Sequence, residues 1–135
     1  MTKEQKETKK EINLFQNLIN KCKYSLQGIK YCLANESSFV LAAIGSCFII
    51  VLGILCDISF VEWVISFGSL ALIIIVELLN TAIEATVDMV TLEYNEYAKI
   101  AKDCGSAAAG IMSILAVIVN LVIFIPHIIK LIIRL

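Results

Sequence analysis

The stretch Leu70-Ala-Leu-Ile-Ile-Ile-Val-Glu-Leu-Leu-Asn-Thr-Ala-Ile-Glu84 decides the fold of this chain. It begins as a membrane span and then takes up two carboxylates and an amide. Ionisable groups are costly to bury in a transmembrane helix, so their presence there indicates a function. On an α-helix five polar side chains share one stripe, namely Glu77, Asn80, Thr81, Glu84 and Asp88. Such a stripe cannot face lipid, so the helix must turn it toward protein or water.

The composition also indicates a membrane protein. Of the 135 residues, 59% are hydrophobic, whereas ordinary soluble domains are about 45–50% apolar. The 11 basic and 12 acidic residues nearly cancel, so nothing supports binding to nucleic acid. The five cysteines form no C-x-x-C pair and are expected to be small apolar side chains rather than metal ligands or disulfides. We expect one all-α integral membrane domain.

Three apolar runs are long enough to cross a hydrocarbon core of about 30 Å. They cover Phe39 to Cys56, Phe60 to about Val90, and about Ala107 to Ile133. Helices are expected, because three spans are too few for a membrane β-barrel. Pro126 is expected to kink or fray the last turns of the third span. The polar first eleven residues lack the apolar core of a signal peptide, so the spans themselves are expected to direct insertion.

The segment before the first span has a different pattern. After a polar tail at residues 1–11, apolar side chains recur at spacings of three and four among lysines: Ile12, Phe15, Ile19, Cys22, Leu26, Ile29 and Leu33. This pattern predicts an amphipathic surface helix over residues 12–35, followed by a three-span domain over residues 36–135. A coiled-coil seam has the same spacing and remains an alternative.

The distribution of basic residues predicts the orientation of the spans. Seven of the eleven basic residues precede the first span, and Lys99 and Lys102 lie between the second and third. The positive-inside rule then places the N-terminus and a loop over residues 91–105 in the cytoplasm and the C-terminus outside. Trp63 is expected to be an anchor at the outer interface, and His127 an interfacial residue distant from other polar groups.

The acidic residues outline a possible reaction centre. Glu36, Glu84, Asp88 and Asp103 are expected to meet on the cytoplasmic side, where carboxylates and phosphate oxygens together can hold Mg²⁺. Glu77 lies about 10 Å deeper than Glu84 along the helix and could act as a general base.

The residues after the second span offer further candidates. Lys99 and Lys102, in a loop expected over Glu93 to Asp103, could hold nucleotide phosphates, although no P-loop or kinase glycine-rich loop is present. Glu93 could instead be a plain solvated charge, and Lys102 with Asp103 a structural pair at a helix start. The small-residue run from Gly105 to Gly110 is typical of close packing between membrane helices.

Two motifs resemble the prokaryotic diacylglycerol kinase family. They are Glu77-Leu-Leu-Asn-Thr-Ala-Ile-Glu84 followed by Asp88, and Ala101-Lys-Asp-Cys-Gly-Ser-Ala-Ala108. Tyr24-Ser-Leu-Gln-Gly28 and Asn35-Glu-Ser-Ser-Phe39 resemble its N-terminal elements. The resemblance implies a surface helix plus three spans assembled as a homotrimer. It also implies sites shared between protomers at the cytosolic boundary of a bacterial inner membrane.

The resemblance implies transfer of the γ-phosphate of MgATP to a lipid alcohol. Glu77 matches the catalytic base and Asn80 the amide beside it, while Glu36 and Glu84 match the metal-coordinating glutamates that also touch ATP. Ser106 matches a position that lines the lipid site. The positions matching nucleotide contacts are Tyr24, Glu93, Tyr94, Lys102 and Asp103, and Asn95 falls at a loop position that approaches ATP in the family.

The chain departs from the family pattern at three positions. A basic ATP contact of the family falls at Asn17, a common arginine at Val40, and a loop histidine at Asn95. The segment after Glu93 and the Lys102-Asp103 motif resemble the diacylglycerol branch of the family, whereas residues 58–63 and 123–126 resemble its undecaprenol branch. We expect diacylglycerol as substrate, with undecaprenol as the alternative and a non-catalytic membrane scaffold as a more remote one.

Overall fold

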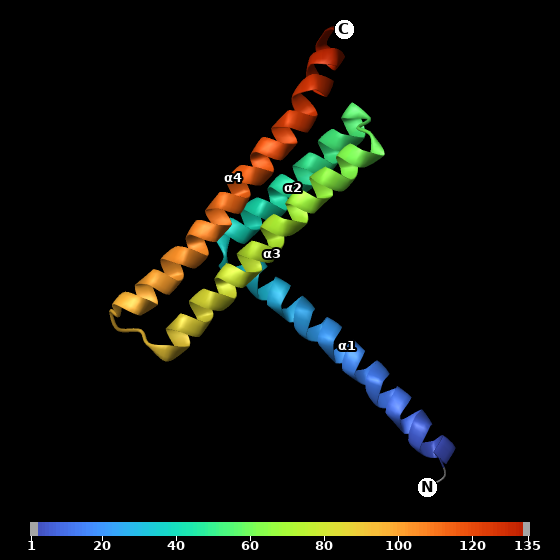
Figure 1. Ribbon diagram of the computed structural model, residues 1–135, viewed down its shortest axis with the longest axis vertical. Coiled ribbons are helices and arrows are strands. Elements are labelled where there is room, and N and C mark those ends of the chain that lie inside the picture. Colours follow the sequence, from blue (N-terminus) through green and yellow to red (C-terminus); the bar gives the residue numbers. More distant parts are fainter. Residues whose placement is uncertain (1–2, 134–135) are drawn as a thin grey trace. The chain divides into compact units, whose positions relative to one another are not determined.

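The computed structural model describes the backbone of residues 3–133 and the side chains of residues 14–133. Over this part of the chain the protein consists of four helices: α1 (Lys3–Asn35), α2 (Ser37–Cys56), α3 (Phe60–Val90) and α4 (Glu96–Ile133) (Figure 1). Helices α2, α3 and α4 are each long and apolar enough to cross a membrane. The predicted all-helical membrane class is confirmed, and the three spans fall where the apolar runs predicted them.

Helix α1 forms one compact unit of the chain, and the residues from Glu36 onward form the other. The helix begins at Lys3 and therefore includes most of the segment expected as a polar tail, while Met1 and Thr2 lie outside the described residues. Several large apolar side chains of α1 are exposed, including Phe15, Ile19 and Leu26. The side chain of Ile12, the first position of the predicted apolar face, lies outside the described side chains.

A short, well-capped turn joins α2 to α3. Asp57 ends α2 in the left-handed region, with φ 48° and ψ 52°, a conformation that aspartate tolerates better than most residues. The Ser59 hydroxyl then accepts a hydrogen bond from the Glu62 backbone N–H, while the Ser59 N–H donates to the Glu62 carboxylate at 2.7 Å. This capping box starts α3 sharply after only three linking residues.

Helices α3 and α4 run side by side in opposite directions (Figure 1). The segment between them covers only residues 91–95, so the expected loop over 91–105 is wrong. The α4 helix begins earlier because the Asn95 side-chain oxygen caps it, accepting from the N–H groups of Tyr97 at 2.9 Å and Ala98 at 3.2 Å. At the other end, α4 continues through Pro126 to Ile133, so its last turns remain helical.

Apolar side chains pack together at the end of the bundle that lies opposite the α3–α4 turn. Ile58, Ile123 and Phe124 form a buried cluster against which Trp63 packs. Trp63 lies so close to Gly53 that a Cβ on this glycine would come within 2.5 Å of the indole ring. The indole expected as an interfacial anchor therefore also locks α2 to α3, and only glycine at position 53 permits this approach.

Buried polar contacts join α3 to α4 farther along the pair. The Asn120 amide accepts a hydrogen bond from the Ser66 hydroxyl at 2.6 Å and donates to Ser69 Oγ at 3.0 Å and to the Ala116 carbonyl at 2.8 Å. Each of the three polar side chains is less than 10% exposed. Because every polar atom in this group has a partner, it can hold the two helices together within a hydrocarbon environment.

Candidate functional site

The polar stripe of α3 turns toward its neighbouring helices. Glu77 and Thr81 are both 7% exposed, Asn80 and Glu84 are half-buried, and Asp88 is exposed at the helix end. The Thr81 hydroxyl donates to the Glu77 backbone carbonyl at 3.1 Å, which leaves the Glu77 carboxylate itself uninvolved. The expectation that the stripe faces protein rather than lipid is confirmed for its buried members.

A groove of about 550 Å³ lies between α2, α3 and α4. Three predicted site residues line it, namely Glu77 and Asn80 from α3 and Ser106 from α4. Among residues 14–133, the Glu77 carboxylate forms neither a hydrogen bond nor an ion pair. The carboxylate oxygens remain accessible from the groove, so they are available to a ligand that enters it.

The Asn80 amide has a hydrogen-bond partner for its nitrogen but none among the described residues for its oxygen. Its Nδ2 donates to Glu84 Oε1 at 2.9 Å, while its Oδ1 is buried and has no hydrogen-bond partner among the described residues. Gly105 of α4 packs against this amide, because a Cβ there would lie 2.5 Å from Asn80 Oδ1. The close packing predicted for the run from Gly105 to Gly110 is therefore confirmed at Gly105, whereas Gly110 has open space beside it.

Three carboxylates form a negatively charged group near this end of the groove. Glu36 and Glu84 both act electrostatically on Glu77, and none of the three pairs with a lysine, arginine or histidine among residues 14–133. Glu36 occupies the N-cap position of α2 but makes no capping hydrogen bond, so its carboxylate is also free. Carboxylates without a cationic partner are a donor set that suits a hard divalent cation.

A divalent cation here would need further ligands. No three of the described His, Cys, Asp and Glu side chains are placed to hold a metal ion by themselves. Mg²⁺ usually takes one or two protein carboxylates and completes its shell with water and substrate phosphates. Glu36 and Glu84 therefore fit Mg²⁺ that arrives together with a nucleotide.

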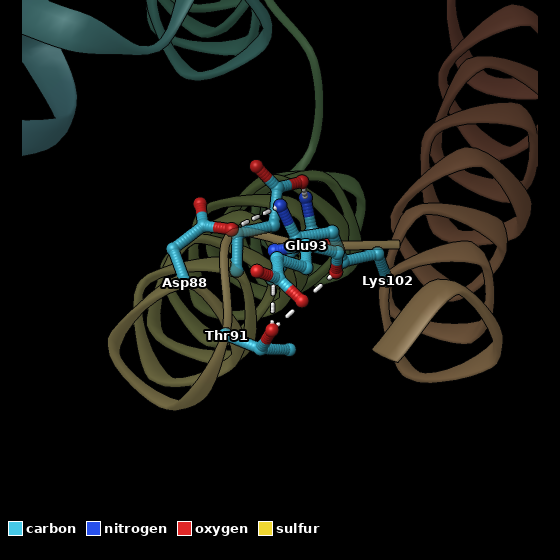
Figure 2. A network of polar contacts seen from close by, with 6 residues as sticks. Asp88, Thr91, Glu93 and Lys102 are labelled. Carbon is cyan, nitrogen blue, oxygen red and sulfur yellow. Dashed lines mark hydrogen bonds and ion pairs between the residues drawn. The ribbon is translucent and has the colours of Figure 1, made fainter. Parts of the chain in front are cut away.

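A second cavity, of about 460 Å³, lies at the turn between α3 and α4. Predicted nucleotide contacts line it: Glu93, Tyr94, Asn95, Lys102 and Asp103. Figure 2 shows Lys102 reaching from α4 to Asp88 at the end of α3, where the two side chains form an ion pair at 2.5 Å. In the same view the Thr91 hydroxyl contacts the backbone of Glu93, accepting from its N–H at 3.1 Å.

The structure corrects the expected arrangement of acidic groups. Asp88 pairs with Lys102, and Asp103 pairs with Lys99 at 2.7 Å, so neither aspartate joins the free carboxylates. Lys102 therefore bridges two helices and does not pair with its neighbour Asp103 at a helix start. Both lysines are at least a third exposed, and exposed pairs of this kind contribute little stability, so either lysine can turn to a phosphate.

Several side chains that form hydrogen bonds between helices were not predicted from the sequence. Asn120, Ser66 and Ser69 are isolated polar residues in apolar runs, and no spacing rule joins two different helices. The expectation that His127 is distant from other polar groups is wrong, because its Nε2 lies 2.9 Å from Glu62 Oε1. The α3–α4 hairpin brings these two residues together although they lie 65 positions apart.

Tyr24, the remaining predicted nucleotide contact, lies on α1 with its ring exposed. It belongs to the unit formed by α1 and not to the unit that contains the groove.

Three apolar helices around a groove that ends at a free carboxylate define an integral membrane protein suited to an amphiphilic ligand. Comparison with known proteins gives the family. Residues 23–124 match the model described as "Prokaryotic diacylglycerol kinase". This chain belongs to that family and is a membrane-embedded lipid kinase.

Individual relatives cover most of the chain. It is 36% identical to the undecaprenol kinase of Bacillus subtilis over 74% of this chain and 81% of the relative. It is 35% identical to the diacylglycerol kinase of Escherichia coli over 84% of this chain and 93% of the relative. With the diacylglycerol kinase of Pseudomonas aeruginosa it shares 41% identity over 67% of this chain and 74% of the relative.

Proposed function

We propose that this kinase transfers the γ-phosphate of ATP to the hydroxyl of diacylglycerol, giving phosphatidic acid and ADP. The observation that carries the assignment of the reaction centre is Glu77, a residue that is 7% exposed, whose carboxylate lacks any described partner and lines a groove of about 550 Å³ between the apolar helices. A hydroxyl is a weak nucleophile until a base accepts its proton, and Glu77 is the buried acceptor in this groove.

Each residue has a defined part in the proposed reaction. Glu77 accepts the proton of the lipid hydroxyl while that oxygen forms a bond to the γ-phosphorus and the bond from phosphorus to the β–γ bridging oxygen breaks. Asn80 is held by Glu84 through a 2.9 Å hydrogen bond and orients the groups beside the base. Ser106 lines the groove on the α4 side and is available to hydrogen-bond the lipid headgroup.

The second cavity is the proposed nucleotide site. Lys102 and Lys99 supply positive charge for phosphates, and the other proposed contacts are Tyr24, Glu93, Tyr94, Asn95 and Asp103. Glu36 and Glu84 would hold Mg²⁺, which supplies charge neutralisation for the transferring phosphoryl group. The backbone of Glu93 is already fixed by Thr91, and Asn95 already caps α4, so Asn95 contributes chiefly by shaping the turn.

The proposal extends to assembly and orientation. We expect α1 to lie on the cytoplasmic surface of the bacterial inner membrane and the protein to form a homotrimer with sites shared between protomers. After replacement of the native cysteines, a Cys at Glu96 should react with an impermeant maleimide from the cytoplasmic side only, and a Cys at Phe60 from the outside only. Labelling of position 96 from outside would contradict the orientation, because ATP is cytoplasmic.

Undecaprenol is the second candidate substrate, since the relative from Bacillus subtilis is an undecaprenol kinase at 36% identity. A direct assay decides between the two. Purified protein in detergent with MgATP is offered diacylglycerol or undecaprenol, and phosphorylated lipid is measured by thin-layer chromatography. We expect a higher kcat/KM for diacylglycerol, and the reverse preference would assign the chain to undecaprenol.

A further inference from the structure

Large apolar side chains gather around the turn between α3 and α4, and each of them is at least 76% exposed. We call this group the turn patch, and its members are Met89, Val90, Leu92, Tyr94 and Tyr97. Exposed side chains in the middle of α3, such as Leu72, Ile75 and Leu79, are only 48–57% exposed. A contiguous apolar surface of this kind marks a site of contact with a partner or a membrane.

The turn is suited neither to the hydrocarbon core nor to bulk water. Residues 91–95 form no helix, and irregular backbone that faces lipid is not tolerated in the hydrocarbon region. Glu93 and Glu96 are also exposed within the patch, and charged groups are costly at the bilayer centre. The apolar side chains, in turn, are unfavourable in water. The headgroup layer meets both demands, and amphipathic tyrosine rings are enriched there.

The length of α3 leads to the same layer. From Phe60 to Val90 the helix rises about 45 Å at about 1.5 Å per residue. A bilayer measures about 40–45 Å with its headgroup layers and about 30 Å without them, so the 20 residues of α2 match the core alone. The α2–α3 turn lies at the opposite end of α3 from the α3–α4 turn (Figure 1), and Phe60 beside it is 82% exposed. Aromatic side chains thus mark both ends of a helix as long as a whole bilayer.

We propose that the turn patch inserts into the lipid headgroup layer and anchors the α3–α4 hairpin to one face of the bilayer. Tyr97 is the main anchor, because it does not line the second cavity, whereas Leu92 and Tyr94 do. Since that cavity is built on the same turn, the anchor holds it at the level of the headgroups. The inference goes beyond the proposed function, because it requires only that the three apolar helices span a membrane.

The test measures the depth of the turn by fluorescence quenching. The chain has one tryptophan, so Trp63→Phe provides a background without tryptophan. Tyr97→Trp is added to this background and reconstituted into phosphatidylcholine vesicles that carry a nitroxide either on the headgroup or deep in the acyl chain. We expect the headgroup nitroxide to remove more of the emission. Ile75→Trp is the matched control, because Ile75 lies midway along α3, is half exposed and lines neither cavity. Its emission should be lost mainly to the deep nitroxide.

Two outcomes would overturn the anchor. Emission of the Tyr97→Trp variant that is quenched by aqueous iodide but by neither nitroxide would place the turn in water. Emission that resists all three quenchers would show that protein, such as a second copy of the chain, covers the patch. If this variant does not insert, Met89→Trp tests the same patch from α3, since Met89 also lines neither cavity. No step requires kinase activity, so failure of the anchor and failure of the proposed function are separate results.

Discussion

Two polar clusters lie between the same helices, α3 and α4, and they differ in whether their hydrogen bonds are complete. In the cluster of Ser66, Ser69 and Asn120, every side-chain polar atom has a partner. In the cluster of Glu77, Asn80 and Gly105, the Glu77 carboxylate and the Asn80 Oδ1 atom have none among the described residues. Unmade hydrogen bonds in a buried site are costly, so the first cluster stabilises the fold, and the second leaves acceptor atoms free for the ligand that we propose.

The same contrast appears at the two ends of the helix pair. Near the α2–α3 turn, Glu62 is engaged by both Ser59 and His127. Near the α3–α4 turn, by contrast, Glu84 accepts only from Asn80 among the described side chains, and the ion pairs of Lys99 and Lys102 are exposed. Exposed pairs are easily exchanged for a phosphate, so the lysines beside the second cavity can leave their aspartates for the nucleotide that we propose binds there.

The largest effect is expected at the incomplete cluster, from Glu77→Gln. This change keeps the shape of the side chain but removes the proton acceptor, so transfer to lipid should fall by about 100-fold or more. MgATP affinity and oligomeric state should stay at wild-type values, and both are measured alongside the kinase rate. Glu77→Asp should also be poor, because the carboxylate retracts by about one methylene from a site that needs hydrogen-bond contact. A near-normal rate for Glu77→Gln would make Glu77 a packing residue and remove the distinction between the clusters.

The next largest effect is expected from neutralising the proposed metal ligands, Glu36→Gln and Glu84→Gln. Glutamine at position 84 can still accept a hydrogen bond from Asn80, so this variant isolates the loss of charge. The apparent Mg²⁺ requirement should rise about tenfold or more, and more than the lipid requirement, because phosphoryl transfer depends on electrostatic positioning. Glu96→Gln is the control, since Glu96 is exposed and lines neither cavity. A normal Mg²⁺ titration for either variant would exclude that residue from the metal site.

A smaller effect is expected from Gly105→Ala. This variant tests the position of Asn80 in the incomplete cluster without changing a charged group. The added methyl would lie 2.5 Å from Asn80 Oδ1, so the amide must shift from its place beside the base. We expect about a tenfold loss of kcat with dioctanoylglycerol, because small misplacements near the reacting groups are costly. Gly68→Ala, on an exposed face of α3, should be silent. Equal rates for the two variants would show that the position of Asn80 does not matter for transfer.

The smallest effect on activity is expected from the complete cluster, through Asn120→Leu. This substitution removes three hydrogen bonds, of which those to Ser66 and Ser69 join α3 to α4. Hydrogen bonds between membrane helices contribute about 0.6–2 kcal/mol each, so unfolding in mixed micelles should show a loss of about 1–4 kcal/mol, while the rate with dioctanoylglycerol changes less than twofold. Leu121→Ala, at an exposed neighbouring position, is the control. If Asn120→Leu instead abolished transfer at unchanged stability, the cluster would belong to the site and not to the fold.

The spans followed from the sequence because long apolar runs have no other stable form in a bilayer. The apolar run also predicted the start of α3 at Phe60, where the structure shows that Ser59 and Glu62 form a local capping box. The start of α4 was predicted wrongly, because Asn95 was not recognised as the residue that caps this helix. The motif around Glu77 was visible because charged side chains are rare in an apolar helix and usually mark a functional site.

The sequence by itself thus determined the class of protein, the spans and the identity of the polar stripe, since these depend on composition and on periodicity within one helix. Only the tertiary structure decided which polar groups are satisfied. It paired Asp88 with Lys102 and His127 with Glu62, and among the described residues it left Glu77 and the Asn80 Oδ1 atom without partners. These outcomes depend on the register between helices. Close packing at Gly53 and Gly105 helps to set that register, and no pattern within a single helix encodes it.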